Sequence, residues 1–152
     1  MKYWEVLETD LVSLTMICDE EALLGLYFGE HEPEDAVRKK TKLIEEVSKQ
    51  LKEYFSGKRQ VFDLPLRPEG TPFQKKVWEA LKTIPFGQTR TYQEIAVQIG
   101  NPKACRAVGG ANNKNPISII IPCHRVIGAG GSLVGYGGGL SLKEKLLRLE
   151  NS

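Results

Sequence analysis

The sequence of 152 residues predicts an α+β fold in two domains, and three observations predict it. Residues that favour β-strands crowd the first thirty positions, and capped helical patterns follow in the second half. A proline-punctuated stretch at 62–70 lies between them and is typical of a linker. The charge changes sign there as well, because residues 1–69 hold 10 Lys and Arg against 15 Asp and Glu, whereas residues 70–152 hold 11 against 4. We expect a small N-terminal antiparallel sheet-plus-helix domain at 1–69 and a mostly helical C-terminal domain at 70–152.

Three short segments rich in β-forming or aliphatic residues begin the first domain. They span 3–7, 11–18 and 22–28. Thr9-Asp10 and Asp19-Glu20-Glu21 separate them and suit tight turns, which predicts an antiparallel meander. A helix is expected over about 34–55, because apolar residues recur there at helical spacing and Gly57 can end it.

Capping boxes mark two helix starts in the second domain. Thr71 to Gln74, with proline at the first helical position, predicts a helix to about residue 83. Thr91 to Glu94 predicts a short helix that Gly100 can end. A last helix is expected from Ser141 to Glu150.

A further short helix, capped by Asn101-Pro102 and running to about Asn112, completes a predicted helix-turn-helix. Its second helix is the expected recognition helix and exposes Lys103 and Arg106. The net charge of +7 over 70–152 suits a polyanion such as DNA. Capped helix pairs also occur in α+β proteins that do not touch DNA, so this alternative stays open.

Composition and cysteine spacing exclude several classes of protein. No apolar run reaches the roughly 18–20 residues that span a bilayer, and the N-terminus lacks the layout of a signal peptide, so we expect no membrane contact and a cytoplasmic protein. Three cysteines are too few, and odd in number, for a disulfide framework. They show no CxxC spacing and only two histidines accompany them, so we expect no metal and no cofactor.

The most reactive cluster of the sequence is Cys123-His124-Arg125, which follows an isoleucine-rich stretch between two prolines. A cysteine framed by apolar residues is usually a core residue. The cationic neighbours favour another interpretation, because they lower a thiol pKa from about 8.5 and enrich the nucleophilic thiolate. Cys123 is therefore a candidate nucleophile.

His124 is the candidate base for that thiol. Adjacent residues of an extended segment point to opposite faces, so we expect a bridging water rather than a direct contact between Cys123 and His124. His124 then needs an orienting acceptor, and Glu150 is one of only four acidic residues in this half. A solvated carboxylate at a helix end is the alternative for Glu150.

Seven glycines and Tyr136 occupy the segment 128–139. Their spacing does not match a GxGxxG phosphate loop. The segment is either a flexible loop or a thin backbone wall for a flat ligand, with free N–H groups as donors.

These motifs together resemble the O6-alkylguanine-DNA alkyltransferases, also called methylated-DNA–protein-cysteine methyltransferases. The resemblance covers residues 71–150 and rests on the run 121–126, on the helix-turn-helix at 92–112 and on the glycine-rich run 135–140. The N-terminal half resembles the family only in length and layout. The family implies a ribonuclease H-like first domain and a winged-helix-like second domain.

The resemblance also implies a role for each matching residue. Cys123 accepts the alkyl group, and His124 with Glu150 relays a proton to the thiol through water. Tyr92 contacts the flipped base and the adjacent phosphate, and Arg106 replaces that base in the stack. The other expected contacts are a hinge at Asn115, an aromatic wall at Tyr136, guanine contacts from the backbones of Val126 and Gly137, and DNA contacts from Lys103 and Arg125.

Alkyl transfer suits these residues chemically. A soft thiolate can displace guanine from an sp3 carbon, and the base must be flipped because its O6 is inaccessible inside a duplex. We expect DNA repair by irreversible, single-turnover transfer of a methyl group from O6 of guanine in duplex DNA to the protein's own cysteine. Alkylation at O4 of thymine stays open as a further target. The protein is expected to be a monomer without an obligate protein partner.

Two positions depart from the family pattern, and two other functions stay open. Gly137 stands where some members have serine, and Lys145 stands where a tryptophan is common. A helix-turn-helix regulator without chemistry would not depend on Cys123. A cysteine hydrolase would turn over, and it needs a base that faces the thiol directly.

Overall fold

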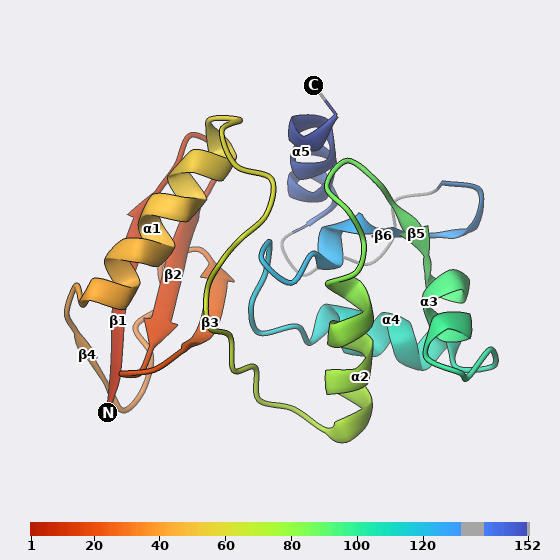
Figure 1. Ribbon diagram of the computed structural model, residues 1–152, viewed down its shortest axis with the longest axis horizontal. Helices are drawn as coiled ribbons and strands as arrows, with labels where there is room; N and C mark the ends of the chain where they lie inside the picture. The colour runs from red at the N-terminus through yellow and green to blue at the C-terminus, as the bar shows by residue number, and fades with distance from the viewer. Residues whose placement is uncertain (132–138, 152) are drawn as a thin grey trace. The chain divides into compact units, whose positions relative to one another are not determined.

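The computed structural model describes residues 1–131 and 139–151 (Figure 1). The chain forms two compact units, each described by itself below. Unit 1 comprises Met1–Glu69 and Pro116–Ser118, and unit 2 comprises Gly70–Asn115 and the chain from Ile119 onward. The sequence did not indicate that residues 116–118 belong with the first unit. The predicted α+β class is confirmed.

A four-stranded sheet forms unit 1, in the order β3-β2-β1-β4. Its strands are β1 (Lys2–Glu8), β2 (Ser13–Cys18), β3 (Leu23–Phe28) and β4 (Ala36–Arg38). The predicted antiparallel meander is confirmed, because β2 runs antiparallel to both β1 and β3. The edge strand β4, which runs parallel to β1, was not predicted.

Helix α1 (Lys42–Phe55) packs on this sheet (Figure 1). Its buried face contains Ile44, Val47 and Leu51 at helical spacing. The predicted start at residue 34 is wrong, because the chain first forms β4. The helix begins only after Thr41, whose side chain accepts a hydrogen bond from the Ile44 N–H and so caps it.

Two segments cover the outer edge of β3, whose backbone groups would otherwise be unpaired. Residues 65–67 pair with Leu23 through hydrogen bonds of 2.8 and 2.9 Å. Residues 116–118 pair with Leu26 through hydrogen bonds of 2.8 and 3.1 Å. The predicted linker is therefore anchored to unit 1, and part of the segment before Cys123 is anchored there too.

Helices dominate unit 2, namely α2 (Pro72–Leu81), α3 (Tyr92–Gln98), α4 (Cys105–Asn113) and α5 (Leu140–Glu150). Both predicted capping boxes are confirmed. In each, the threonine side chain accepts from the third N–H of the helix, and the Gln74 or Glu94 side chain accepts from the threonine N–H in return.

Two predicted helix starts in unit 2 are wrong. Helix α4 begins at Cys105 without a side-chain cap, because the Asn101 carbonyl instead closes a turn by accepting from the Ala104 N–H at 3.0 Å. Helix α5 begins at Leu140 rather than Ser141 and follows Gly139, whose φ of 93° is rarely adopted by residues with a Cβ.

Short segments link these helices to the reactive cluster. Strands β5 (Arg90–Thr91) and β6 (Val126–Ile127) pair in parallel, which places the start of α3 beside the residues that follow Cys123. The 3-10 turns η1 (Cys123–Arg125) and η2 (Ala129–Gly131) flank β6. The core between the helices is apolar, with Leu81, Ile95, Val108 and Leu146 all fully buried.

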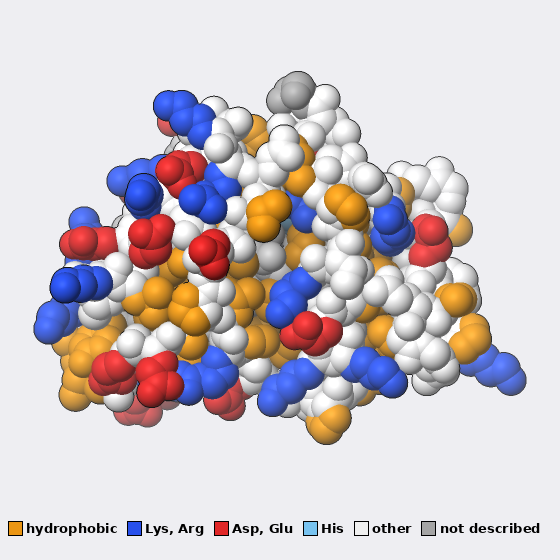
Figure 2. Space-filling model, viewed as in Figure 1, with side chains coloured by type: hydrophobic (Ala, Val, Ile, Leu, Met, Phe, Trp, Pro, Cys, Tyr) orange, Lys and Arg blue, Asp and Glu red, His pale blue; other side chains and the backbone are white. Residues whose placement is uncertain are grey.

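Charges are distributed differently over the two units. Figure 2 shows acidic and basic side chains interspersed over the part of this face formed by α1 and the sheet. Over the part formed by unit 2, Lys and Arg side chains have few acidic neighbours, in keeping with 11 basic and 4 acidic residues over 70–152.

Candidate active site

Cys123 opens the 3-10 turn η1, and this corrects the prediction of an extended segment. Pro122 precedes it with φ −81° and ψ 66°, and the Arg125 N–H donates back to the Pro122 carbonyl at 3.0 Å. A 3-10 turn has three residues per turn, so its successive side chains point in three directions. The thiol and the imidazole therefore do not lie on opposite faces of a strand.

Two asparagines hold the backbone of this turn. The Asn115 amide donates to the Ile121 carbonyl at 2.8 Å, and the Asn112 amide donates to the Cys123 carbonyl at 3.3 Å. Asn115 was expected to fasten this segment, whereas Asn112 was missed. The helical spacing could have indicated Asn112, because it lies four residues after the buried Val108 and therefore on the buried face of α4. The thiol they position is itself buried, with 4% of Cys123 exposed.

His124 is fully buried and bound to Glu150, with 2.6 Å between Nε2 and Oε2. Burial lowers the pKa of His124 from its ordinary value, and the hydrogen bond to Glu150 opposes that shift. The imidazole is therefore neutral at pH 7, with its proton on Nε2, where the carboxylate accepts it. Nδ1 is left as a proton acceptor, and it has no hydrogen-bond partner within residues 1–131 and 139–151. Glu150 is thus buried rather than a solvated carboxylate.

Arg125 departs from its expected contact with DNA. It is buried, and its Nε and Nη2 donate to the two oxygens of Glu150 at 2.8 and 3.0 Å. Its Nη1 donates to the Ile84 carbonyl at 2.8 Å. The guanidinium therefore binds groups within unit 2, where it holds the Glu150 carboxylate in place and compensates its negative charge.

Gly87 completes the surroundings of Glu150. Its N–H lies 3.5 Å from Oε1, and its φ is +80°. A Cβ there would lie 3.3 Å from the Glu150 carbonyl oxygen. Only glycine combines this backbone conformation with this close approach.

Tyr92 and Lys143 share the electrostatic surroundings of the thiol. Tyr92 is the first residue of α3, and its pKa is raised by burial and then by negative charge on Cys123. Lys143, on α5, is fully buried, with its Nζ 5.9 Å from the centroid of the Tyr92 ring. The sequence did not indicate Lys143, because a lysine on a helix usually lies at the surface.

The predicted DNA-contacting residues occupy several places. Arg106 lies in the first turn of α4 and Lys103 in the turn before it, and both are exposed. Val126 is buried in β6, in register with Arg90. Tyr136 and Gly137 lie outside the described residues.

The part of the chain that the structure describes, residues 1–131 and 139–151, contains neither a metal-binding cluster nor a helix that could span a membrane. No group of three or more His, Cys, Asp or Glu side chains within that part could hold a metal ion. No helix among its residues has the length and apolar character needed to cross a bilayer.

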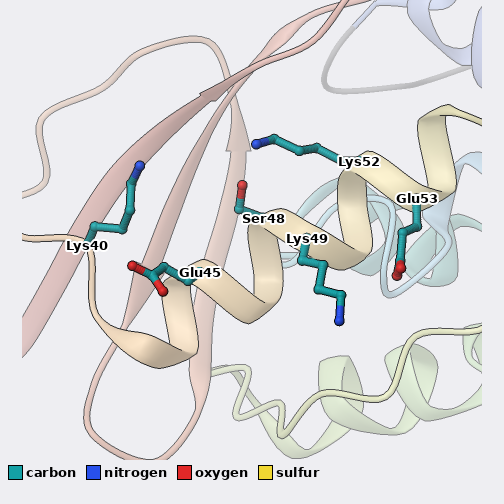
Figure 3. A pocket seen from close by; sticks show the side chains of 6 residues that line it. All are labelled: Lys40, Glu45, Ser48, Lys49, Lys52 and Glu53. Atoms are coloured by element: carbon teal, nitrogen blue, oxygen red, sulfur yellow. The ribbon is translucent and has the colours of Figure 1, made fainter.

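A hollow on the surface of unit 1 offers no alternative active site. Basic and acidic side chains are interspersed along α1 where they line it (Figure 3). The lining consists of Lys40, Glu45, Ser48, Lys49, Lys52 and Glu53. It lacks both cysteine and histidine, so no thiol or imidazole is present there for nucleophilic or acid–base chemistry.

Comparison with known proteins agrees with this site. Residues 72–152 match the DNA binding domain of 6-O-methylguanine DNA methyltransferase, and residues 2–68 match its ribonuclease-like domain. The chain is 53% identical to a methylated-DNA–protein-cysteine methyltransferase of Methanosarcina acetivorans, with 99% of both chains covered. It is 42% identical to the constitutive enzyme of that name from Bacillus subtilis, over 99% of this chain and 96% of that one.

Solved structures agree as well. The OGT of Mycobacterium tuberculosis in complex with DNA superposes with a TM-score of 0.93 at 45% identity, covering 98% of this chain and 92% of that one. An O6-methylguanine DNA methyltransferase from Methanococcus jannaschii superposes with a TM-score of 0.72 at 29% identity, covering 97% and 93%. The resemblance noted in the sequence is thereby confirmed, and the chain belongs to the 6-O-methylguanine DNA methyltransferase family.

Proposed function

We propose that the protein repairs alkylated DNA by moving a methyl group from O6 of guanine to the thiolate of Cys123. The sulfur–carbon bond forms as the carbon–oxygen bond breaks, and the electron pair leaves on the guanine oxygen. The observation that carries this proposal is the buried Cys123 placed next to the His124–Glu150–Arg125 cluster. The names of the relatives support the same chemistry.

The cluster suits the proton movement that this reaction needs. The thiol proton passes through a bridging water to Nδ1 of His124, and Glu150 stabilises the cation that forms. Once the base has left as an anion, the proton returns to it. The product on the protein is a thioether, which is not hydrolysed, so each molecule acts once.

Helices α3 and α4 bind the DNA that contains the damaged base. Helices α3 and α4 form the predicted helix-turn-helix, and a DNA complex of a relative supports duplex DNA as the partner. Flipping the base costs a few kcal/mol, which Arg106 offsets in part by taking its place in the stack. Lys103 contacts phosphate, while Tyr92 and the Val126 backbone contact the base.

Intact mass tests the reaction directly. The protein is incubated with duplex DNA carrying O6-methylguanine and is expected to gain one methyl group, mapped to Cys123, as ordinary guanine appears in the DNA. Cys123→Ala is expected to gain nothing, whereas Cys105→Ala, which removes a partly exposed thiol, is expected to gain the same mass as the wild type. No gain on the wild type, or an unchanged gain on Cys123→Ala, rules out the proposal.

Two further measurements, the number of turnovers per protein molecule and the sequence preference of DNA binding, decide between the alternatives. Several turnovers per molecule would indicate a cysteine hydrolase. Sequence-specific DNA binding with no dependence on Cys123 would indicate a regulator without chemistry.

Arg106→Ala tests the proposed place of this residue in the stack. The variant is expected to slow repair of duplex DNA about tenfold or more, because the flipped state loses its support. Its reaction with free O6-benzylguanine is expected to stay close to that of the wild type. Equal losses with both substrates would contradict the proposed role.

We further propose that the protein acts in the cytoplasm as a monomer. Sedimentation is expected to give one species of 17.0 kDa in the absence of DNA. A concentration-dependent dimer would contradict this.

A further inference from the structure

We propose that Asn112 is a positioning residue for the reaction, and that its Oδ1 holds the water that relays the Cys123 proton to His124. This inference deepens the proposed function and rests on it. The two ends of the amide have different tasks, since Nδ2 fixes the backbone of the nucleophile while Oδ1 orients the water.

The Asn112 amide is buried and has a defined orientation. Its Nδ2 donates to the Cys123 carbonyl at 3.3 Å, and only 1% of the residue is exposed. The reversed amide would bring two acceptors together, namely Oδ1 and the carbonyl oxygen. The two ends of an amide lie about 2.3 Å apart, so Oδ1 lies within about 6 Å of the Cys123 carbonyl oxygen.

Two buried acceptors next to Cys123 have no donor. Oδ1 of Asn112 and Nδ1 of His124 are the two buried side-chain polar atoms without a hydrogen-bond partner in residues 1–131 and 139–151. His124 follows Cys123 in η1, and Asn112 binds the carbonyl of Cys123. Because the imidazole proton is on Nε2, where Glu150 accepts it, Nδ1 cannot donate to Oδ1. Both atoms therefore need a donor from outside the protein.

One water molecule supplies a donor to each of these acceptors. Buried waters typically make about three hydrogen bonds to polar groups that the protein itself does not satisfy. The proposed water donates one O–H to Oδ1 of Asn112 and the other to Nδ1 of His124. It accepts the S–H of Cys123 as its third hydrogen bond.

This arrangement decides which O–H of the water moves. The thiol proton passes to the water oxygen as the O–H that faces His124 gives its proton to Nδ1, and the S–H electron pair stays on sulfur. The former thiol proton then points from the water to the thiolate, while the O–H bound to Asn112 does not move. Because a hydrogen bond to the charged form favours that form, the held water stabilises the Cys123 thiolate.

Labelling of Cys123 with iodoacetamide between pH 4 and 10 tests this role without DNA. The rate is followed by peptide mass in the wild type and in Asn112→Leu, which replaces the amide by an apolar group of similar size. The pH midpoint is expected to rise by about one unit, and the rate below the midpoint to fall about tenfold, because the thiolate loses the water held next to it. Asn113→Leu changes an exposed asparagine of the same helix and is expected to alter neither.

A further variant separates this role from a merely structural one. Asn115→Leu removes the bond to the Ile121 carbonyl and so loosens the same segment, but it retains Oδ1 of Asn112. It is expected to lower the rate by the same factor at every pH. An unchanged midpoint in Asn112→Leu, or an equal shift in both variants, overturns the proposal. If Asn112→Leu does not fold, Asn112→Met decides by the same criterion.

A crystal structure of the wild-type protein checks the water itself. One water is expected within about 3.2 Å of both Oδ1 of Asn112 and Nδ1 of His124, and it is expected to be lost in Asn112→Leu. A wild-type crystal structure without a water on Oδ1 overturns the proposal. Failure of the wild type to take a methyl group from DNA would refute the proposed function, while the labelling profile and the water would still decide the role of Asn112.

Discussion

Glu150 is bound by two other buried residues of unit 2, Arg125 and His124. Its two oxygens accept from the Arg125 guanidinium, and one of them also binds His124. Breaking such a buried pair by removing one partner leaves a charge without compensation. Glu150 is therefore expected to affect both the stability of the fold, through Arg125, and methyl transfer, through His124.

Glu150→Gln is expected to cost about 3–5 kcal/mol of unfolding free energy, because Arg125 would stay buried without its counter-charge. Methyl transfer is expected to slow as well, since His124 loses its anionic partner. Urea unfolding and single-turnover kinetics measure the two effects. Glu144→Gln, which removes an exposed carboxylate of the same helix, is expected to change stability by less than about 1 kcal/mol. Equal effects of both variants would contradict this account.

The buried neutral His124 predicts a pH dependence of stability. Its pKa is lower in the folded protein than in the unfolded chain, so below about pH 6.5 the unfolded chain binds the additional proton. The contribution of the neutral His124 to the free energy of unfolding is therefore fully present above pH 6.5. It declines as the pH falls towards the lowered pKa, by at most about 1.4 kcal/mol per pH unit. Denaturant titrations at several pH values measure the slope.

Variants of the two histidines assign that slope. His124→Gln is expected to flatten the pH dependence of the unfolding free energy between pH 5 and 6.5. This window lies between the ordinary pKa values of carboxylates and of histidine. His31→Gln changes the exposed histidine of unit 1 and is expected to leave this pH dependence unchanged. A slope that persists in His124→Gln would assign the effect to other groups.

At the scale of elements, the caps of the helices position the site. The capping box of α3 fixes the backbone at Tyr92, the residue directly after Thr91. An identical type of box begins α2 at Thr71, away from the thiol in sequence. The two caps thus have the same local chemistry but different neighbours.

This pair of caps gives a matched test. Thr91→Ala and Thr71→Ala are each expected to lower stability by about 1 kcal/mol, because each leaves helix N–H groups without an acceptor. Only Thr91→Ala is expected to slow methyl transfer, since it loosens Tyr92. Thermal unfolding and single-turnover rates separate the effects, and a comparable slowing in Thr71→Ala would show that stability alone limits the rate.

At the scale of the whole molecule, the chain leaves unit 2 after Asn115 and returns at Ile119. The three residues between them pair with β3. Ile119 has a φ of 70°, which is a strained conformation for a β-branched residue. The segment before Cys123 is thus constrained at both ends, by pairing at residues 116–118 and by Asn115 and Asn112.

Ser118→Pro tests whether this pairing matters for the chemistry. It removes the N–H that donates to the Leu26 carbonyl, and is expected to cost about 1–3 kcal/mol and to slow transfer. Arg67→Pro removes the corresponding bond to Leu23, together with an ion pair to Asp19, and is expected to reduce stability without a comparable effect on the rate. Calorimetry and single-turnover kinetics give both readouts, and equal slowing would contradict a specific role for residues 116–118.

Local signals account for what the sequence predicted well. The meander and both capping boxes were correct, because alternation and capping act within a few residues. The starts of α1, α4 and α5 were wrong. Competing local structure decided them, namely the strand β4, the turn closed by Asn101, and Gly139 at positive φ.

By itself, the sequence determined the two-part α+β fold and the basic second half. Its motif Cys123-His124-Arg125, together with the flanking motifs, also indicated the family of the chain. The tertiary structure alone decided that Arg125 binds Glu150, that Lys143 is buried, and that residues 116–118 pair with β3. The physical reason is sequence separation. Whether a cation faces DNA or a buried carboxylate depends on which distant segments pack around it, and no local spacing encodes that choice.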